Sequence, residues 1–506
     1  MSAMTARRLT VLALVALLMY GAFGYIGGYA AYLRGDGYRE ACAAALTDHL
    51  ELPSDIGAVV PRSRHWREFR DIAVWLPQRR GRALTCEQAL VMLEPTADDP
   101  NAYEIQVRGG TCEISTRTWL REDYRGVLEA GLRTGFQPDG PRRVTFEKMN
   151  LHFERDRFRA QLDQAAGLVD FIDPRCGRAA ISCWKFNGYD CEQAVRLGAV
   201  FCAFDGRVRI DQLELVVPEI PIRAADLKSL AGVDVQSGDF AGRLTYEETE
   251  DGRLTVVSGK CRALDLSECT VDLTPQPWRG ECREIELQEL RVVDRSPERL
   301  RFRGVLTGVE LGDILATWGL EGVRGAVNLV VGDADLSHRG IDRFIASGGG
   351  KGIELESLSR GLGWGVMTGD LTLIISDLTI EDNHIKSLDA ELRVADAEGT
   401  PNWIEGRLLQ TLIERTLKVA LPPLLPERIE YVKLGVKIEI RDEILYVFGT
   451  HGPRESVILT ARLYEQDVPI VIEPRRSFDL GPWLDDLRRR ASDRIEMNLP
   501  VHPRTP

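Results

Sequence analysis

The glycine-rich stretch "SGGGKG", residues 347–352, invites interpretation as a phosphate-binding loop, because successive glycine amides can cradle phosphates. The P-loop motif requires a glycine five residues before Gly350, where this chain has Ile345. It also requires Ser or Thr after the lysine, where this chain has Gly352. The sequence therefore favours a flexible loop between strands over a nucleotide site.

His451 is the second candidate, because it lies in the glycine turn "GTHG", residues 449–452. No Cys, Asp or Glu follows at the spacing of a metal ligand, so a turn residue is a better interpretation than a base or a ligand. The chain has no GxSxG, HExxH or EF-hand motif. We therefore predict a protein that is not an enzyme, with no catalytic residue and no cofactor.

A small acidic group, Asp377, Glu381 and Asp382, is a candidate calcium site. The alternating carboxylates of a calcium loop are absent, which favours solvated turn residues. Arg488, Arg489 and Arg490 suit phosphate or lipid headgroups, but a solvated helix face is the safer interpretation.

Ten cysteines provide a further possible chemistry. Their spacing contains no CxxC pair, which argues against zinc and favours disulfides in an oxidising compartment. Buried thiols are the third alternative. The connectivity is open. The cysteines are Cys42, Cys86, Cys112, Cys176, Cys183, Cys191, Cys202, Cys261, Cys269 and Cys282.

The N-terminal sequence predicts a membrane anchor. Residues 9–33 contain no charged side chain and are long enough to span a hydrocarbon core of roughly 30 Å, whereas the apolar region of a signal peptide has about 7–15 residues. Arg7 and Arg8 favour a cytoplasmic tail at residues 1–8. The rest of the chain is then expected outside the cytoplasm, as a single-pass protein.

Length and charge limit the remaining function classes. A chain of 506 residues predicts several domains or one elongated repetitive body. The formal net charge of −13, from 64 basic and 77 acidic residues, disfavours binding to nucleic acid.

Residues 34–400 show the pattern of short antiparallel strands. In "GDLTLIISDLTIEDNHIKSLDAELRV", residues 369–394, apolar and polar positions alternate through three runs, and Asp251-Gly252 predicts a hairpin turn. One helix is expected near residues 118–135. The strands have one apolar and one charged face, which suits an open β-groove or closed sandwiches. We predict a mainly β fold: a transmembrane helix, then an elongated, repetitive antiparallel sheet with a few amphipathic helices.

Residues 401–506 differ from this body. "NWIEGRLLQTLIERTLKVALPPLLP" predicts an amphipathic helix that includes Trp403 and Ile404 and ends before Pro422. Strands are expected to resume from "IEYVKLGVKIEIRDEILYVFG", and a tail follows.

The closing stretch "IEYVKLGVKIEIRDEILYVFGTHGPRESVILTARLYEQDVPIVIE" resembles the AsmA-like family of bacterial envelope proteins, relatives of TamB. The matching positions are Tyr431, Leu434, Ile438, Arg441-Asp442, Leu445 and Gly452. The chain departs from the family pattern at Asp442-Glu443, where an acidic residue followed by glycine is usual, and in "GTHGP".

This resemblance implies a protein anchored in the inner membrane, with most of the chain in the periplasm. It also implies a β-groove that binds or conveys lipid acyl chains during envelope and outer-membrane biogenesis. The expected partners are lipid acyl chains, the inner membrane and other envelope proteins, and the resemblance transfers no catalytic residue. The alternative hypothesis is a tethered β-sandwich module that binds a protein partner without transporting lipid.

Overall fold

The fold is taken from a computed structural model of the chain. It describes residues 28–479, except positions 30, 51, 64, 236, 295, 339, 443 and 464 and the ranges 77–80, 93–102, 116–140, 156–157, 173–174, 205–206, 226–233, 250–251, 271–278, 317–321, 362–364, 395–400, 411–425 and 475–477. The chain divides into two compact units, residues 1–218 with 245–251 and residues 219–244 with 252–506.

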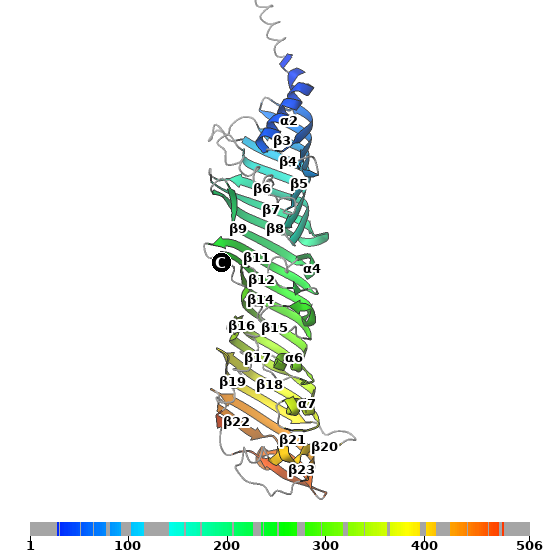
Figure 1. Ribbon diagram of the computed structural model, residues 1–506, viewed down its shortest axis with the longest axis vertical. Helices are drawn as coiled ribbons and strands as arrows, with labels where there is room; N and C mark the ends of the chain where they lie inside the picture. Colours follow the sequence, from blue (N-terminus) through cyan, green and yellow to red (C-terminus); the bar gives the residue numbers. More distant parts are fainter. Residues whose placement is uncertain are drawn as a thin grey trace, which may run out of the picture. The chain divides into compact units, whose positions relative to one another are not determined.

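The first unit is a helix followed by a sheet whose strands lie side by side in chain order (Figure 1). Its elements are α2 (Asp36–Leu50), β1 (Ser54–Pro61), β2 (Trp66–Trp75), β3 (Arg82–Met92), β4 (Tyr103–Ser115), β5 (Pro141–Arg155), β6 (Phe158–Phe171), β7 (Cys176–Phe186), β8 (Tyr189–Phe204) and β9 (Arg207–Pro221), whose last three residues belong to the second unit.

One strand pair of this unit corrects the prediction of a wholly antiparallel sheet. Strands β4 and β5 are parallel, with Ile105 opposite Val144, whereas the pairs from β1 to β4 and from β5 to β9 are antiparallel. A parallel pair needs a crossover that returns the chain to the starting edge. Residues 116–140 make this connection, and the helix predicted near residues 118–135 lies outside the described residues.

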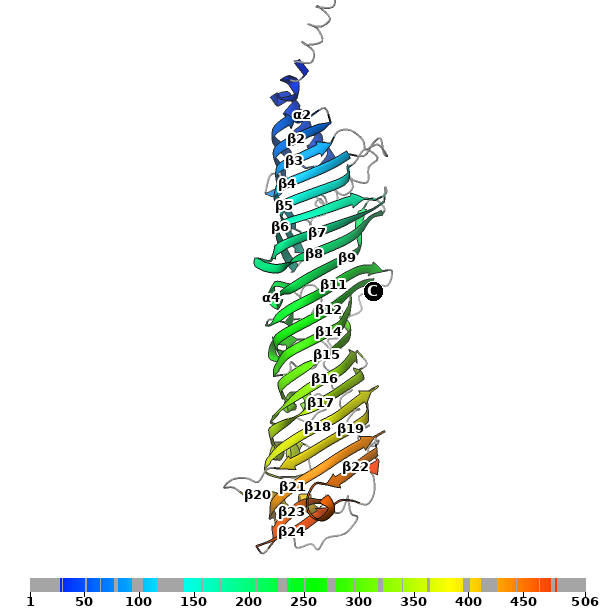
Figure 2. The same ribbon diagram turned by 180° about the vertical axis from the view of Figure 1, so that it is seen from behind.

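The first helix of the second unit is α4 (Ile222–Ala225), and long hairpins dominate this unit (Figure 2). Its strands are β10 (Asp234–Val235), β11 (Asp239–Thr249, shared with the first unit), β12 (Gly252–Asp265), β13 (Cys269–Thr270), β14 (Glu281–Val293), β15 (Ser296–Glu310), β16 (Ala326–Ser337), β17 (Gly340–Glu354), β18 (Asp370–Glu381), β19 (His384–Val394), β20 (Asn402–Glu405), β21 (Arg428–Arg441), β22 (Ile444–Gly449), β23 (Val457–Leu463), β24 (Gln466–Ile472) and β25 (Phe478–Asp479). Short helices are η3 (Leu266–Glu268), α6 (Leu311–Ala316), α7 (Leu355–Gly361) and η4 (Pro453–Glu455).

The sheet of the second unit is open. From β12 through β14–β19 to β21 each strand pairs antiparallel with the next, and β20, β22, β23, β24 and β25 continue the same sheet. The other described sheet of the unit, β10 with β13, has only two residues in each strand. A β-sandwich needs two sheets that face each other. The described residues of this unit provide no second sheet of that size, so the prediction of an open antiparallel sheet is confirmed and that of closed sandwiches is wrong.

Residues 369–394 form one hairpin. Asp382 and Asn383 connect β18 to β19 with φ angles of 52° and 62°, the left-handed conformation that Asp and Asn tolerate in tight hairpin turns. The expectation that Asp382 is a turn residue is confirmed. The prediction of three strand runs is wrong, because Asp377 continues β18 and pairs with Asp389.

The part of the second unit from α4 to β18 contains a repeat of about 44 residues. At the end of each return strand, the amide of an apolar residue donates a hydrogen bond to a glycine carbonyl and a short helix begins. The four bonds join Ile222 to Gly238, Leu266 to Gly280, Leu311 to Gly325 and Leu355 to Gly369, at 2.8–3.0 Å. Each of these glycines has a positive φ.

Three hairpins of this repeat also contain a β-bulge in the middle of their strands. The register shifts at Gln288 of β14, Gly332 of β16 and Ser376 of β18, again about 44 residues apart. A bulge adds one residue, bends the strand and increases its twist. Because the bulges lie on consecutive hairpins, the sheet bends along one line that crosses the strands.

Glycine makes this bend possible. Gly348 of β17 lies beside the bulge with φ 152°, and a Cβ there would lie 2.1 Å from the carbonyl oxygen of Asn328. A Cβ at Gly349 would lie 2.2 Å from the carbonyl oxygen of Leu373, and a Cβ at Gly350 would lie 2.3 Å from that of Ala326. The stretch predicted to be a flexible loop is therefore the interior of a strand, where only glycine allows such close backbone approach.

We expect Gly348→Ala to lower the free energy of unfolding by about 1–3 kcal/mol, because the methyl group forces the two backbones apart. Gly332→Ala is the matched control, since a Cβ at that bulge meets nothing closer than 3.8 Å. Denaturant unfolding followed by circular dichroism measures both. Equal stability of the two variants would contradict the assigned role of Gly348.

The predicted C-terminal helix begins later than expected. Asn402–Glu405 form β20, paired with Arg428–Tyr431 of β21, and residues 406–410 are helical. Trp403 and Ile404 are thus strand residues, because their backbone pairs with the edge of β21. Residues 411–425 lie outside the described residues.

The predicted anchor lies almost wholly outside the described part of the chain, which begins at residue 28. No helix among the described residues is long and apolar enough to cross a membrane.

Candidate functional site: an apolar inner face

The inner face of the second unit is defined here as the side on which apolar side chains align from strand to strand. Three rows of directly paired residues cross the sheet on this side, and every member is apolar or glycine. The rows are Leu264, Cys282, Leu306, Leu329, Gly348, Ile375, Ala390, Ile438 and Val447; Cys261, Ile285, Gly304, Val331, Ala346, Leu378, Leu388, Ile440 and Leu445; and Gly259, Leu287, Phe302, Ala334, Phe344, Ile380 and Ile385.

Part of this inner face is accessible. Val331, Ala334 and Ala346 are almost fully buried, whereas Ile375, Leu378 and Leu388 keep an intermediate exposure. In a closed core such residues would be covered by a facing layer. Partly exposed apolar side chains in continuous rows instead give a surface onto which an apolar partner can pack.

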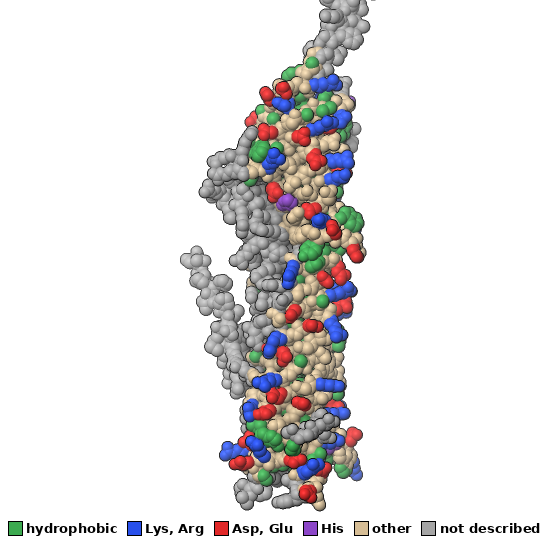
Figure 3. Space-filling model, turned by 90° about the vertical axis from the view of Figure 1, so that its right-hand side faces the viewer, with side chains coloured by type: hydrophobic (Ala, Val, Ile, Leu, Met, Phe, Trp, Pro, Cys, Tyr) green, Lys and Arg blue, Asp and Glu red, His purple; other side chains and the backbone are tan. Residues whose placement is uncertain are grey.

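The outer face has the opposite chemistry. Figure 3 shows, on the side of the molecule that it presents, Lys and Arg side chains interspersed with Asp and Glu. Cross-strand ion pairs join Arg303 to Glu286 at 2.6 Å and Lys437 to Asp389 at 3.5 Å. Hydrogen bonding to the Glu439 carboxylate is the main reason why the pKa of Lys437 is raised. Each exposed pair adds little stability, but together they keep this face hydrated.

One rim of the sheet is formed by the short helices of the repeat. At α6, the Arg279 amide and guanidinium both donate to the Asp313 carboxylate, at 2.8 and 3.0 Å. Burial raises the pKa of Asp313, but the hydrogen bonds from Arg279 outweigh it, so the pKa is lowered. Ser357 of α7 takes the place of Asp313 in the next repeat, and its hydroxyl accepts a hydrogen bond of 2.9 Å from the Arg324 amide. The Arg279–Asp313 pair thus holds α6, and the Ser357 hydroxyl makes the corresponding contact at α7.

The predicted acidic group does not form a site. Asp377 lies within β18, where Ser387 donates a hydrogen bond to its carboxylate, while Glu381 is 3.8 Å from Arg343. Asp382 belongs to the turn. In the described part of the chain no three His, Cys, Asp or Glu side chains could hold a metal ion. Arg488, Arg489 and Arg490 lie outside that part.

His451 is a buried turn residue. Its Nε2 lies 3.0 Å from the Thr460 hydroxyl, and its side chain is 8% exposed. Burial, with a smaller contribution from the Lys433 charge, lowers the pKa of His451, so the neutral imidazole is the native form. Its role is to bridge the loop to β23.

We expect His451 to make the protein less stable in acid. Because the folded pKa lies below the ordinary value of about 6.5, the unfolded chain binds the proton more tightly, and stability falls as the pH drops through this window. Each unit of pKa lowering is worth about 1.4 kcal/mol.

His451→Gln retains a hydrogen-bonding group and removes the titration. Denaturant unfolding at pH 7.5 and pH 5 should show a smaller loss of stability in this variant than in the wild type. Identical losses would contradict the assignment.

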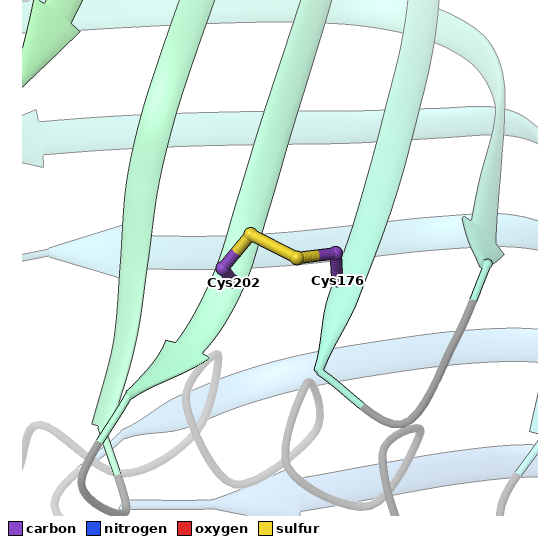
Figure 4. The surroundings of a disulfide bond; sticks show 2 residues. All are labelled: Cys176 and Cys202. Carbon is purple, nitrogen blue, oxygen red and sulfur yellow. A yellow bond between two sulfur atoms is a disulfide. The ribbon is translucent and has the colours of Figure 1, made fainter.

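The cysteine cluster contains one disulfide. Cys176 of β7 and Cys202 of β8 are directly opposite in the ladder, with Cα atoms 4.2 Å apart, and form a bond (Figure 4). The preference for disulfides over zinc is thus confirmed for this pair. Its connectivity depends on register, which the spacing of the cysteines does not reveal.

The 44-residue repeat was not predicted, although the sequence contains a signal for it. "GVEL" at residues 308–311 and "GIEL" at residues 352–355 mark the same corner of the fold, and "ALDL" at residues 263–266 is a third version. The first residue of each has a left-handed φ of 51–68°. A search for internal periods of this length reveals such repeats.

Comparisons of the chain with protein-family models, curated proteins and solved structures found no match. The AsmA-like resemblance therefore stays a prediction.

Proposed function

We propose that the chain is a membrane-anchored envelope protein whose apolar inner face binds and conveys lipid acyl chains. The observation that carries this proposal is the set of three transverse rows without a single polar side chain. The uncharged N-terminal stretch and the AsmA-like pattern supply the location, the inner membrane with most of the chain in the periplasm.

The chemistry of the inner face fits a chain of methylenes. An apolar surface binds without directional contacts and tolerates sliding, because no hydrogen bond must break as the ligand moves. Each methylene removed from water contributes roughly 0.8 kcal/mol, so about ten of them contribute on the order of 8 kcal/mol before the entropy cost of binding. At Gly259, Gly304 and Gly348 no side chain projects from the inner face.

The outer face supports the same proposal. Its paired charges keep the sheet hydrated and present no uniform positive surface for nucleic acid. A ligand held on the inner face would leave its polar headgroup at a rim, in water. No charged side chain in the three rows would have to lose its hydration when an acyl chain binds.

The test is site-specific photocrosslinking in the full chain in its native membrane. A photoreactive phenylalanine analogue replaces Ile375 on the inner face or the neighbouring Ile374, which is 44% exposed on the outer face. We expect lipid adducts, detected by mass spectrometry, at position 375 and not at position 374. Protein adducts without lipid at 375 would instead favour a protein-interaction module.

A charge on the inner face should weaken lipid binding. Ile375→Asp puts a carboxylate in the middle of the apolar rows, and we expect at least a tenfold loss of retained lipid, since an ion there must lose its hydration. Ile374→Asp adds the same charge to the outer face and should retain lipid like the wild type. Lipid extraction and mass spectrometry measure both. Equal retention would place the lipid elsewhere.

A further inference from the structure

The hairpin of β7 and β8 holds a second pair of sulfurs. The two strands are joined by Asn187-Gly188 and carry four cysteines, of which Cys176 and Cys202 are already linked at the open end. Cys183 is fully buried and Cys191 is 9% exposed, and both are thiols. They lie nearer the turn, on the same two strands.

A large bulge brings these two thiols to the same side of the hairpin. Lys185 pairs with Asp190, but the next pair is Cys183 with Val195, so residues 191–194 of β8 face only Trp184 of β7. In a regular ladder Cys191 would lie opposite Trp184, on the other face from Cys183. The bulge turns Trp184 outward, where it is 61% exposed, and leaves both sulfurs inside.

The sulfurs also share a small environment. The amides of the consecutive residues Lys185 and Phe186 point at Cys183 and Cys191 respectively. Burial, followed by the proximity of Cys191, raises the pKa of the Cys183 thiol to about 12. Burial raises the pKa of Cys191 as well. Two neutral thiols thus adjoin successive amides of one bulge.

We propose that Cys183 and Cys191 form a second disulfide of this hairpin. The oxidant is a disulfide-bearing thiol oxidant, represented by oxidised glutathione. The more exposed Cys191 attacks it as a thiolate, forms a mixed disulfide and releases one glutathione thiol. Cys183 then attacks the Cys191 sulfur and releases the second. Two thiol protons are lost, and two electrons pass to glutathione.

The bond forms while the hairpin is still accessible. Thiol–disulfide exchange proceeds through thiolates, and burial suppresses the thiolate forms of Cys183 and Cys191 in the native protein. The resulting bond closes the bulge covalently, in addition to the existing bond at the other end of the strands. It would fix the local bend of the first unit, where the ladder itself is interrupted.

Cys86 and Cys112 provide the contrasting case. Across β3 and β4, Cys86 faces Gly110, and Cys112 faces Leu84, so the two cysteines are diagonal neighbours. Diagonal positions lie about 7–8 Å apart, beyond the usual reach of a disulfide. They are therefore expected to stay thiols in the same molecule and serve as an internal control.

The experiment is a disulfide map of the full chain isolated from an oxidising compartment. The protein is quenched in acid, denatured without reduction, alkylated with N-ethylmaleimide and digested with trypsin. Cleavage after Arg178, Lys185 and Arg196 separates the four cysteines into four peptides. We expect peptides 179–185 and 186–196 to be linked, with a mass two hydrogens below their sum, while Cys86 and Cys112 are alkylated.

Variants make the result decisive. In Cys191→Ser, Cys183 should become alkylated while the link between Cys176 and Cys202 remains. Alkylation of both Cys183 and Cys191 in wild-type protein that contains the Cys176–Cys202 link would overturn the proposal. A link of Cys183 or Cys191 to any other cysteine would overturn it equally. Refolding the reduced chain in a glutathione redox buffer should reproduce the linked pair.

Discussion

The structure of the second unit depends on the close approach of backbones at a line of β-bulges. A strand with a strict period of two presents one face to each side but runs straight apart from its twist. The extra residues at Gln288, Gly332 and Ser376 bend successive hairpins at the same level. Glycine at 348 lets the neighbouring strand pass at a distance that no side chain permits.

The repeat explains why the bend is regular. Each repeat of about 44 residues is a hairpin that ends in a short helix. Its apolar face is covered or continued only by the neighbouring repeats. Stacking such units extends one surface without requiring a second sheet. The amides of Leu311 and Leu355 donate hydrogen bonds to the carbonyls of Gly325 and Gly369 and fix each corner in the same way. The strands of successive repeats therefore keep the same alignment, and the rows of the inner face continue from one repeat to the next.

The same geometry separates the two chemistries of the molecule. After a bulge the alternation of inward and outward residues restarts, so Asp377 follows Ser376 without interrupting the apolar row of Leu378. Charged residues gather on the outer face, where water and cross-strand partners satisfy them. The proposed lipid function rests on this separation, because an apolar ligand needs an uninterrupted surface, whereas the sheet as a whole must stay hydrated.

The sequence alone determined that the chain is mainly β, that Asp382 is a turn residue, and that the strands have one apolar side. These are local properties, set by side-chain period and turn chemistry. Only the tertiary structure decided that β4 and β5 are parallel, that Gly348 lies inside a strand, that Trp403 belongs to β20, and which cysteines meet. Pairing joins residues far apart in the chain, and one bulge reverses the face of every residue beyond it, so a local pattern cannot fix the register.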